Sequence, residues 1–228
     1  MKNPMMAETG ASATSRCPPL AAGVLLLALL GLAGCSPVQV YSSARHDNLG
    51  LAAGDLEAHG IAFISPSAIT GREEDKQGLA LIFAQVLRER RPGVRVVGLS
   101  QTLGRINENG LGDAYIGMYS DYQNTGLFKR EILAEVGRTT GCRYLAQLKL
   151  ASFEQDSSSR FGALGLRIVN TKLARVRLFF QVWDSQTGAI VWEGIEELTN
   201  SSETTREKLI TFRSVVEAGA GNLIGLLP

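Results

Sequence analysis

The sequence contains few cysteines and fewer histidines. Of its 228 residues, three are cysteine and two are histidine. A Ser-His-Asp or Cys-His site needs a histidine held beside its nucleophile, and a zinc site needs several nitrogen or sulfur ligands. His46 and His59 precede the segments that we expect to form the core, so both are predicted to be exposed. The sequence therefore predicts no catalytic residue, no metal ligand and no enzyme.

The chain also lacks an excess of charge of either sign. Removing Lys2 and Arg16 from the 23 basic residues, and Glu8 from the 22 acidic ones, leaves 21 of each after Cys35. A neutral domain has no long-range positive field to attract nucleic acid, which we exclude as a partner. No glycine pattern matches a phosphate-binding loop, so no cofactor is predicted.

No apolar run is long enough to cross a membrane. Residues 21–34 read AAGVLLLALLGLAG, and about 14 residues at 1.5 Å each span roughly 21 Å, less than the ~30 Å hydrocarbon core. Arg16 precedes the run, and Met1, Met5 or Met6 could each be the start. This arrangement is typical of the apolar region of a signal peptide.

The end of the run resembles the bacterial lipobox. In Leu32-Ala33-Gly34-Cys35, small residues at the two positions before the cysteine would give the lipoprotein signal peptidase access to the bond. The resemblance implies a signal peptide over residues 1–34, cleavage before Cys35, and a covalent lipid on that thiol. Such an anchor is effectively permanent. Ser36, in place of an aspartate, implies transfer to the outer membrane, on its periplasmic face.

One cysteine remains after processing. Cys17 leaves with the signal peptide and Cys35 carries lipid, so only Cys142 stays a thiol, which we expect to be a small buried residue.

The segment after the anchor, residues 35–59, is small and polar with little periodicity. It is predicted to form a flexible tether, although Val38, Val40 and Tyr41 alternate as in an edge strand.

The fold predicted for residues 60–228 is α+β, with helices packed on a mixed sheet of about five strands in the order βαβαααβββα. Apolar residues at helical spacing indicate a helix that ends before Pro92-Gly93, and another over the C-terminal residues, where Gly219 and Gly221 would allow close packing on the sheet. Alternation over 175–182, a turn at Asp184 to Gly188, and Ile190 to Trp192 predict a hairpin.

Three short segments resemble the TolB N-terminal-like domain. They are residues 60–64 (GIAFI), residues 140–145 (TGCRYL), and the hairpin from Val182 to Trp192. Lipoproteins with that domain include the curli secretion channel subunit and outer-membrane activators of peptidoglycan synthases. The resemblance covers roughly residues 60–226, but Cys142 and Arg143 stand where the family commonly has a small residue and an aspartate.

A basic stretch is the candidate partner surface. No acidic residue lies between Asp156 and Asp184, whereas basic residues recur there, and the candidates are Arg167, Lys172, Arg175 and Arg177. These side chains either belong to a solvated outer strand face or dock an acidic partner or anionic envelope polymer.

Three functions remain open. The first is a non-catalytic adaptor that binds another envelope protein or a peptidoglycan-associated assembly. The second is a subunit of a curli-type secretion pore, in which residues 160–182 would insert in the membrane and the chain would form a homo-oligomer. The third is a periplasmic enzyme, which the scarcity of histidine disfavours.

Overall fold

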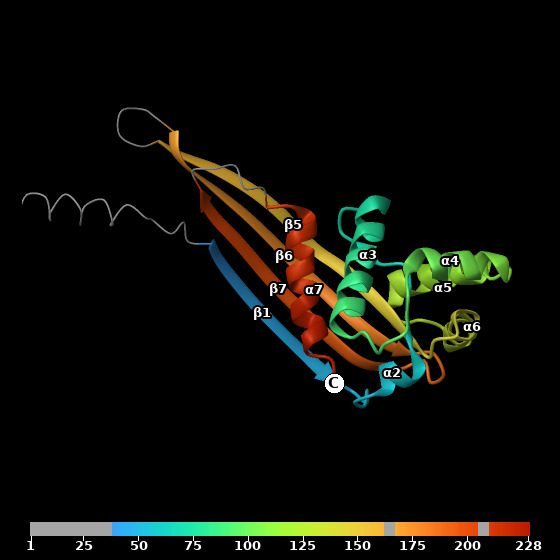
Figure 1. The fold of residues 1–228 in the computed structure, drawn as a ribbon. Helices are drawn as coiled ribbons and strands as arrows, with labels where there is room; N and C mark the ends of the chain where they lie inside the picture. The colour runs from blue at the N-terminus through green and yellow to red at the C-terminus, as the bar shows by residue number, and fades with distance from the viewer. Residues whose placement is uncertain (1–37, 162–166, 205–209) are drawn as a thin grey trace, which may run out of the picture. The chain divides into compact units, whose positions relative to one another are not determined.

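The fold is built around one mixed β-sheet, seen obliquely in the computed structural model of Figure 1. The structure describes residues 38–161, 167–204 and 210–228, and side chains within 39–156, 173–201 and 210–228. Seven strands lie in the order β1-β7-β6-β5-β2-β4, with β3 beside β5. Their bounds are β1 Val38–Asn48, β2 Ile61–Phe63, β3 Ser67–Ala68, β4 Val96–Val97, β5 Tyr144–Phe161, β6 Arg167–Asp184 and β7 Ile190–Thr204. The strands β1, β7, β6 and β5 pair antiparallel, whereas β2, β3 and β4 pair parallel to their neighbours.

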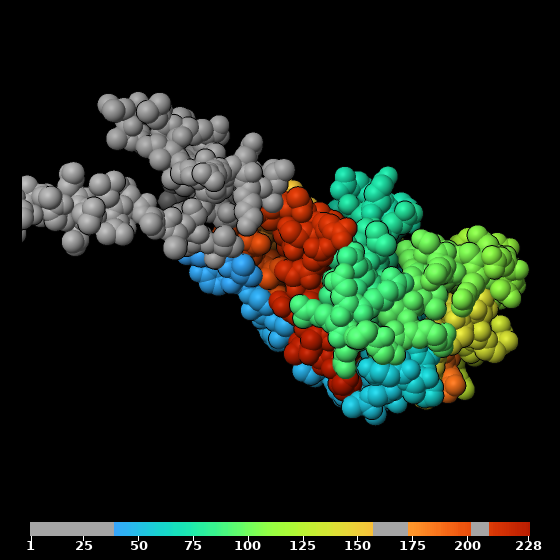
Figure 2. Space-filling model, in the orientation of Figure 1, coloured from blue at the N-terminus to red at the C-terminus, as the bar shows by residue number. Residues whose placement is uncertain are grey.

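Six helices pack on this sheet within the described residues. They are α2 Asp55–His59, α3 Glu73–Arg90, α4 Leu99–Glu108, α5 Gly112–Thr125, α6 Arg130–Thr140 and α7 Phe212–Gly225. Helices α3 and α7 lie side by side on one face, as Figures 1 and 2 show. Buried residues of α5 and α6 form a second cluster with Leu145 and Trp183 on the opposite face, near the start of β5.

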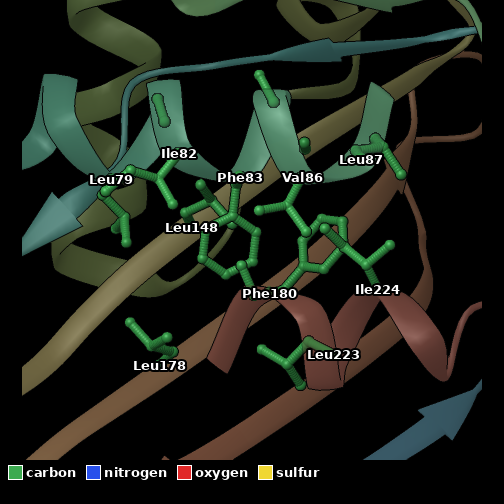
Figure 3. Close-up of a cluster of buried hydrophobic side chains, with 14 of the residues drawn as sticks. Leu79, Ile82, Phe83, Val86, Leu87, Leu148, Leu178, Phe180, Leu223 and Ile224 are labelled. Carbon is green, nitrogen blue, oxygen red and sulfur yellow. The ribbon is translucent and has the colours of Figure 1, made fainter. Parts of the chain in front are cut away.

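Side chains along β6 point alternately to the two faces of the sheet, so the strand contributes to a hydrophobic cluster on each face. Leu178 and Phe180 are fully buried beneath α3 and α7, and the Phe83 ring meets that of Phe180 edge-on at 5.7 Å between centroids (Figure 3). Trp183 points to the other face, where Phe128 packs against it at 5.1 Å. Burial of such side chains stabilises the fold by about 1.5–3 kcal/mol each.

The α+β class and the packing of helices on a mixed sheet are confirmed. The hairpin is confirmed as well: Gly188 has φ +75°, and its N–H donates to the Asp184 carbonyl at 2.8 Å. A left-handed residue closes the turn there, and glycine adopts that conformation without strain.

The expected tether over 35–59 is wrong for most of its length. Val38–Asn48 forms β1, which pairs with β7 from Val38 opposite Ser202 to Asn48 opposite Trp192, and Asp55–His59 forms α2. The edge strand indicated by the alternation of Val38, Val40 and Tyr41 is confirmed. The small polar residues that follow gave no such signal, because an edge strand that is solvated on both faces needs no apolar alternation. The sheet consequently has seven strands rather than about five.

Candidate functional site

The predicted lipidation site lies outside the described residues. Leu32, Ala33, Gly34 and Cys35 all precede Val38, the first residue of β1, and only Ser36 and Pro37 separate Cys35 from it. The described residues contain no helix with the length and hydropathy needed to cross a membrane.

Acidic side chains of neighbouring strands balance part of the positive charge of the basic stretch, which its sequence alone does not indicate. Arg175 and Arg177 are exposed on the face of β6 that α3 and α7 leave free. Arg175 lies 3.7 Å from Glu154 of β5, and Arg177 lies 2.8 Å from Glu197 of β7. Antiparallel pairing brings these acids in from neighbouring strands, so they offset the charge at two of the four candidates.

The other two candidates, Arg167 and Lys172, belong to β6 by their backbone, and their side chains lie outside the description. The partner surface therefore stays a prediction. Exposed ion pairs such as Arg177 to Glu197 contribute about 0–1 kcal/mol, so Arg175 and Arg177 remain available for exchange with another acidic group.

A hollow of about 610 Å³ opens at the end of the sheet where β5 begins. Arg95, Arg138 and Arg143 line it, together with Gly141, Ser185 and other residues of the adjoining turns. Arg138 pairs with Glu135, and Arg95 donates to the carbonyls of His59 and Gly141, where α2 and α6 end. The basic groups of this hollow thus bind carbonyl groups at helix ends, or carboxylates, of the same chain.

Arg143 makes the most specific of these contacts. Its Nε and Nη2 donate to the two carboxylate oxygens of buried Asp184 at 3.1 and 2.8 Å. Burial of Asp184 opposes ionisation, but the bonds from Arg143 and from the Gln186 backbone N–H outweigh it and lower the pKa of the carboxyl. Charge pairing at this position fixes the β6–β7 turn against the start of β5.

Cys142 is buried, with 1% of its surface exposed, as the sequence predicts. Burial raises the pKa of its thiol, which disfavours the reactive thiolate. His46 and His59 are both exposed, as expected, but they lie in β1 and α2 rather than in a tether. No group of residues suited to holding a metal ion occurs among the residues that the structure describes.

Sequence reasoning missed a buried carboxylate beneath α7. Glu196 of β7 is 0% exposed, and its Oε1 accepts hydrogen bonds from Ser42 of β1 at 2.6 Å and from Asn222 of α7 at 3.1 Å. Its Oε2 has no partner within the described residues. The period-two pattern could have revealed this burial, because Glu196 shares a strand face with Trp192 and Leu198.

Comparison with known proteins finds likeness in structure alone. No protein-family model matches the sequence, and no curated protein matches it. The PelC dodecamer from Paraburkholderia phytofirmans is 14% identical, covers 82% of this chain and 97% of its own, and has a TM-score of 0.47. The lipoprotein GNA1162 from Neisseria meningitidis is 11% identical, with 73% of this chain and 98% of its own covered, and has a TM-score of 0.42. The LpoB C-terminal domain from Salmonella enterica is 14% identical, with 61% of this chain and 82% of its own covered, and has a TM-score of 0.32.

These are likenesses of fold at low sequence identity, and no sequence family is shown. The relation to the TolB N-terminal-like domain therefore stays a hypothesis.

Proposed function

We propose that the protein is a non-catalytic lipoprotein, anchored in the outer membrane by a lipid on Cys35 and facing the periplasm, where its α/β domain binds another envelope protein. The motif Leu32-Ala33-Gly34-Cys35 at the end of a short apolar run carries this proposal. The shortage of histidine, with both copies exposed, supports a binding role over a catalytic one.

The position of β1 supports a close association with the membrane. Three residues reach about 10 Å when extended, so the lipid on Cys35 would hold Val38 within that distance of its attachment point. The register aligns Val38 with Ser202, Lys172 and Ser157 across the sheet. That end of the sheet would lie nearest the membrane, and the opposite end, with α2 and α6, would be presented to the periplasm.

The anchor is tested by substituting its cysteine. Cys35→Ala removes the only thiol in the lipobox, so the variant should incorporate no fatty-acid analogue in metabolic labelling and should keep residues 1–34. Cys17→Ala is the matched control, because Cys17 precedes the apolar run, and it should be labelled as the unsubstituted protein is. Label retained on Cys35→Ala would contradict the proposed anchor.

A further inference from the structure

The outer side of β1 is an open sheet edge. The strand ends the order β1-β7-β6-β5-β2-β4, and β7 is the one strand that pairs with it among the described residues. Residues 39–48 are all exposed, and Figures 1 and 2 show β1, in blue, along the side of the molecule next to α7. A whole strand therefore presents its backbone to the surroundings.

The register identifies the backbone groups that point outward. Leu49 N–H donates to the Val191 carbonyl at 2.9 Å, directly after the Asn48 to Trp192 pair. Because alternate residues of an antiparallel strand bond to the same neighbour, every second residue back from Leu49 faces β7. The residues in between turn their N–H and C=O groups outward, and these are Val40, Ser42, Ala44, His46 and Asn48.

Over Val38–Ala44 this edge lacks the features that usually block strand addition. It has no proline and no register shift, and Val38–Ala44 carries no charged residue. Val40 and Tyr41 are 54% and 66% exposed. Proteins commonly protect such edges with charge, proline, bulges or a covering segment. At the opposite edge β4 has two residues, and Arg88 donates to the Val96 carbonyl at 3.2 Å.

Two charges define the chemistry of the missing neighbour. Arg45 and Asp47 lie two positions apart on the sheet face that α7 does not cover, and neither forms an ion pair within the described residues. A strand opposite them would be complementary if it carried an acid beside Arg45 and a base beside Asp47. Opposite Val40 to Ala44 it would carry uncharged residues that favour strands.

We propose that an extended segment of the partner protein adds to the outer edge of β1 as an eighth strand of the sheet. This inference rests on the adaptor function proposed above and names its binding surface. Main-chain hydrogen bonds along the edge supply affinity, and Arg45 and Asp47 supply specificity.

A second copy of this chain is the less favourable occupant. Two β1 strands related by a two-fold axis pair antiparallel, which would place the two Val38 ends about 34 Å apart, at about 3.4 Å for each of the steps along the 11 residues. The lipidated cysteines, three residues away, reach about 10 Å. Both anchors would reach one membrane only if both sheets lay flat on it.

The test is site-specific photo-crosslinking of the full-length lipidated protein in the cell envelope. The photoreactive residue p-benzoylphenylalanine replaces Gln39, Tyr41 or Ser43, which share the uncovered face and leave both charges in place. Strand addition predicts that the three adducts map to one continuous partner segment, displaced by two residues at each step. Arg138, Arg175 and Arg177 are the comparison positions.

A matched pair of variants tests the backbone contribution. Ala44→Pro removes an outward N–H while sparing the ladder to β7, since edge strands tolerate proline. It should lower the adduct yield at position 41 by about tenfold, because the partner strand loses one main-chain hydrogen bond at position 44 and the proline ring disturbs its pairing there. Ala44→Thr keeps the N–H and should retain the yield. Equal melting temperatures of the two variants show that both remain folded.

Each outcome has a defined meaning. An ordered ladder of adducts that Ala44→Pro reduces supports strand addition. Scattered adducts, adducts to another copy of this chain, or yields unaffected by Ala44→Pro overturn it. Partner adducts from Arg138, Arg175 or Arg177 alone overturn it while leaving the adaptor function intact. The absence of protein adducts at all six positions overturns the adaptor function as well.

Discussion

At the residue scale, Trp192 joins the edge strand to the core. Its ring is 0% exposed, stacks with His46 of β1 at 6.0 Å between centroids, and meets Phe180 at 5.3 Å. A side chain at Gly194 would collide with the ring, since an added Cβ would lie 2.6 Å from its Cη2 atom. The indole therefore fills a space whose walls come from three strands.

Trp192→Ala should lower the free energy of unfolding by about 3–5 kcal/mol, because it leaves a cavity in a packed core. Denaturant unfolding of a chain beginning at Ser36 measures the change. Ala189→Ser, at an exposed position in the same hairpin, should change the value by less than about 0.5 kcal/mol. A loss below about 1 kcal/mol for Trp192→Ala would mean that the ring contributes little to the core.

At the element scale, a glycine of α7 leaves no room for a side chain between the helix and the sheet. A Cβ at Gly219 would lie 2.7 Å from Leu178 Cδ1 and 3.4 Å from Glu196 Cγ. The close approach predicted from the C-terminal glycines is thus confirmed at Gly219. Asn222, one turn later, bonds to Ser42 and Glu196, so α7 is tied to β1 as well as to β7.

Gly219→Ala should destabilise the protein by about 1–3 kcal/mol, since the methyl group displaces α7 from β6. Alanine favours a helix over glycine by about 1 kcal/mol, so propensity alone predicts the opposite sign. Gly225→Ala, also in α7, is the control, because the nearest atom to its added Cβ is 3.9 Å away. Thermal unfolding distinguishes the two, and stabilisation by Gly219→Ala would contradict the packing argument.

At the scale of the whole molecule, the described sheet offers no continuous apolar band to lipid. One face is packed against α3 and α7 through Val176, Leu178 and Phe180. The other carries Arg175 and Arg177 with their acidic neighbours. The described side chains at these positions of the second face are therefore charged and paired.

A chain beginning at Ser36 should accordingly remain soluble and folded without detergent, since it keeps every described residue. If the protein is the proposed adaptor, its full-length form should produce no ion conductance in planar bilayers, because an adaptor needs no pore. Stable conducting rings of the full-length protein would instead establish the secretion-pore alternative based on residues 160–182. Sedimentation of the soluble chain and single-channel recording decide between them.

Local patterns in the sequence were sufficient to predict most of the helices and strands. Helical spacing from Leu79 to Leu87 predicted α3, and Pro92-Gly93 predicted where it stops. Alternation along β6 and the glycine at 188 predicted the hairpin, because each of these signals depends on residues close together in the chain. The lipobox prediction on Cys35 is likewise a local motif and awaits its chemical test.

Only the tertiary structure decided how distant segments meet. Val38–Asn48 becomes a strand because β7, more than 140 residues later, supplies its hydrogen-bonding partner. Glu154 and Glu197 reach Arg175 and Arg177 across strand pairs, so counting charges along one strand overestimated the local charge. Glu196 shares an apolar strand face with Trp192 and Leu198, but only the return of α7 over that face supplies its partner Asn222. Pairing and burial between remote segments depend on the register of the whole sheet, which the sequence pattern of a strand that is polar on both faces, such as β1, specifies only weakly.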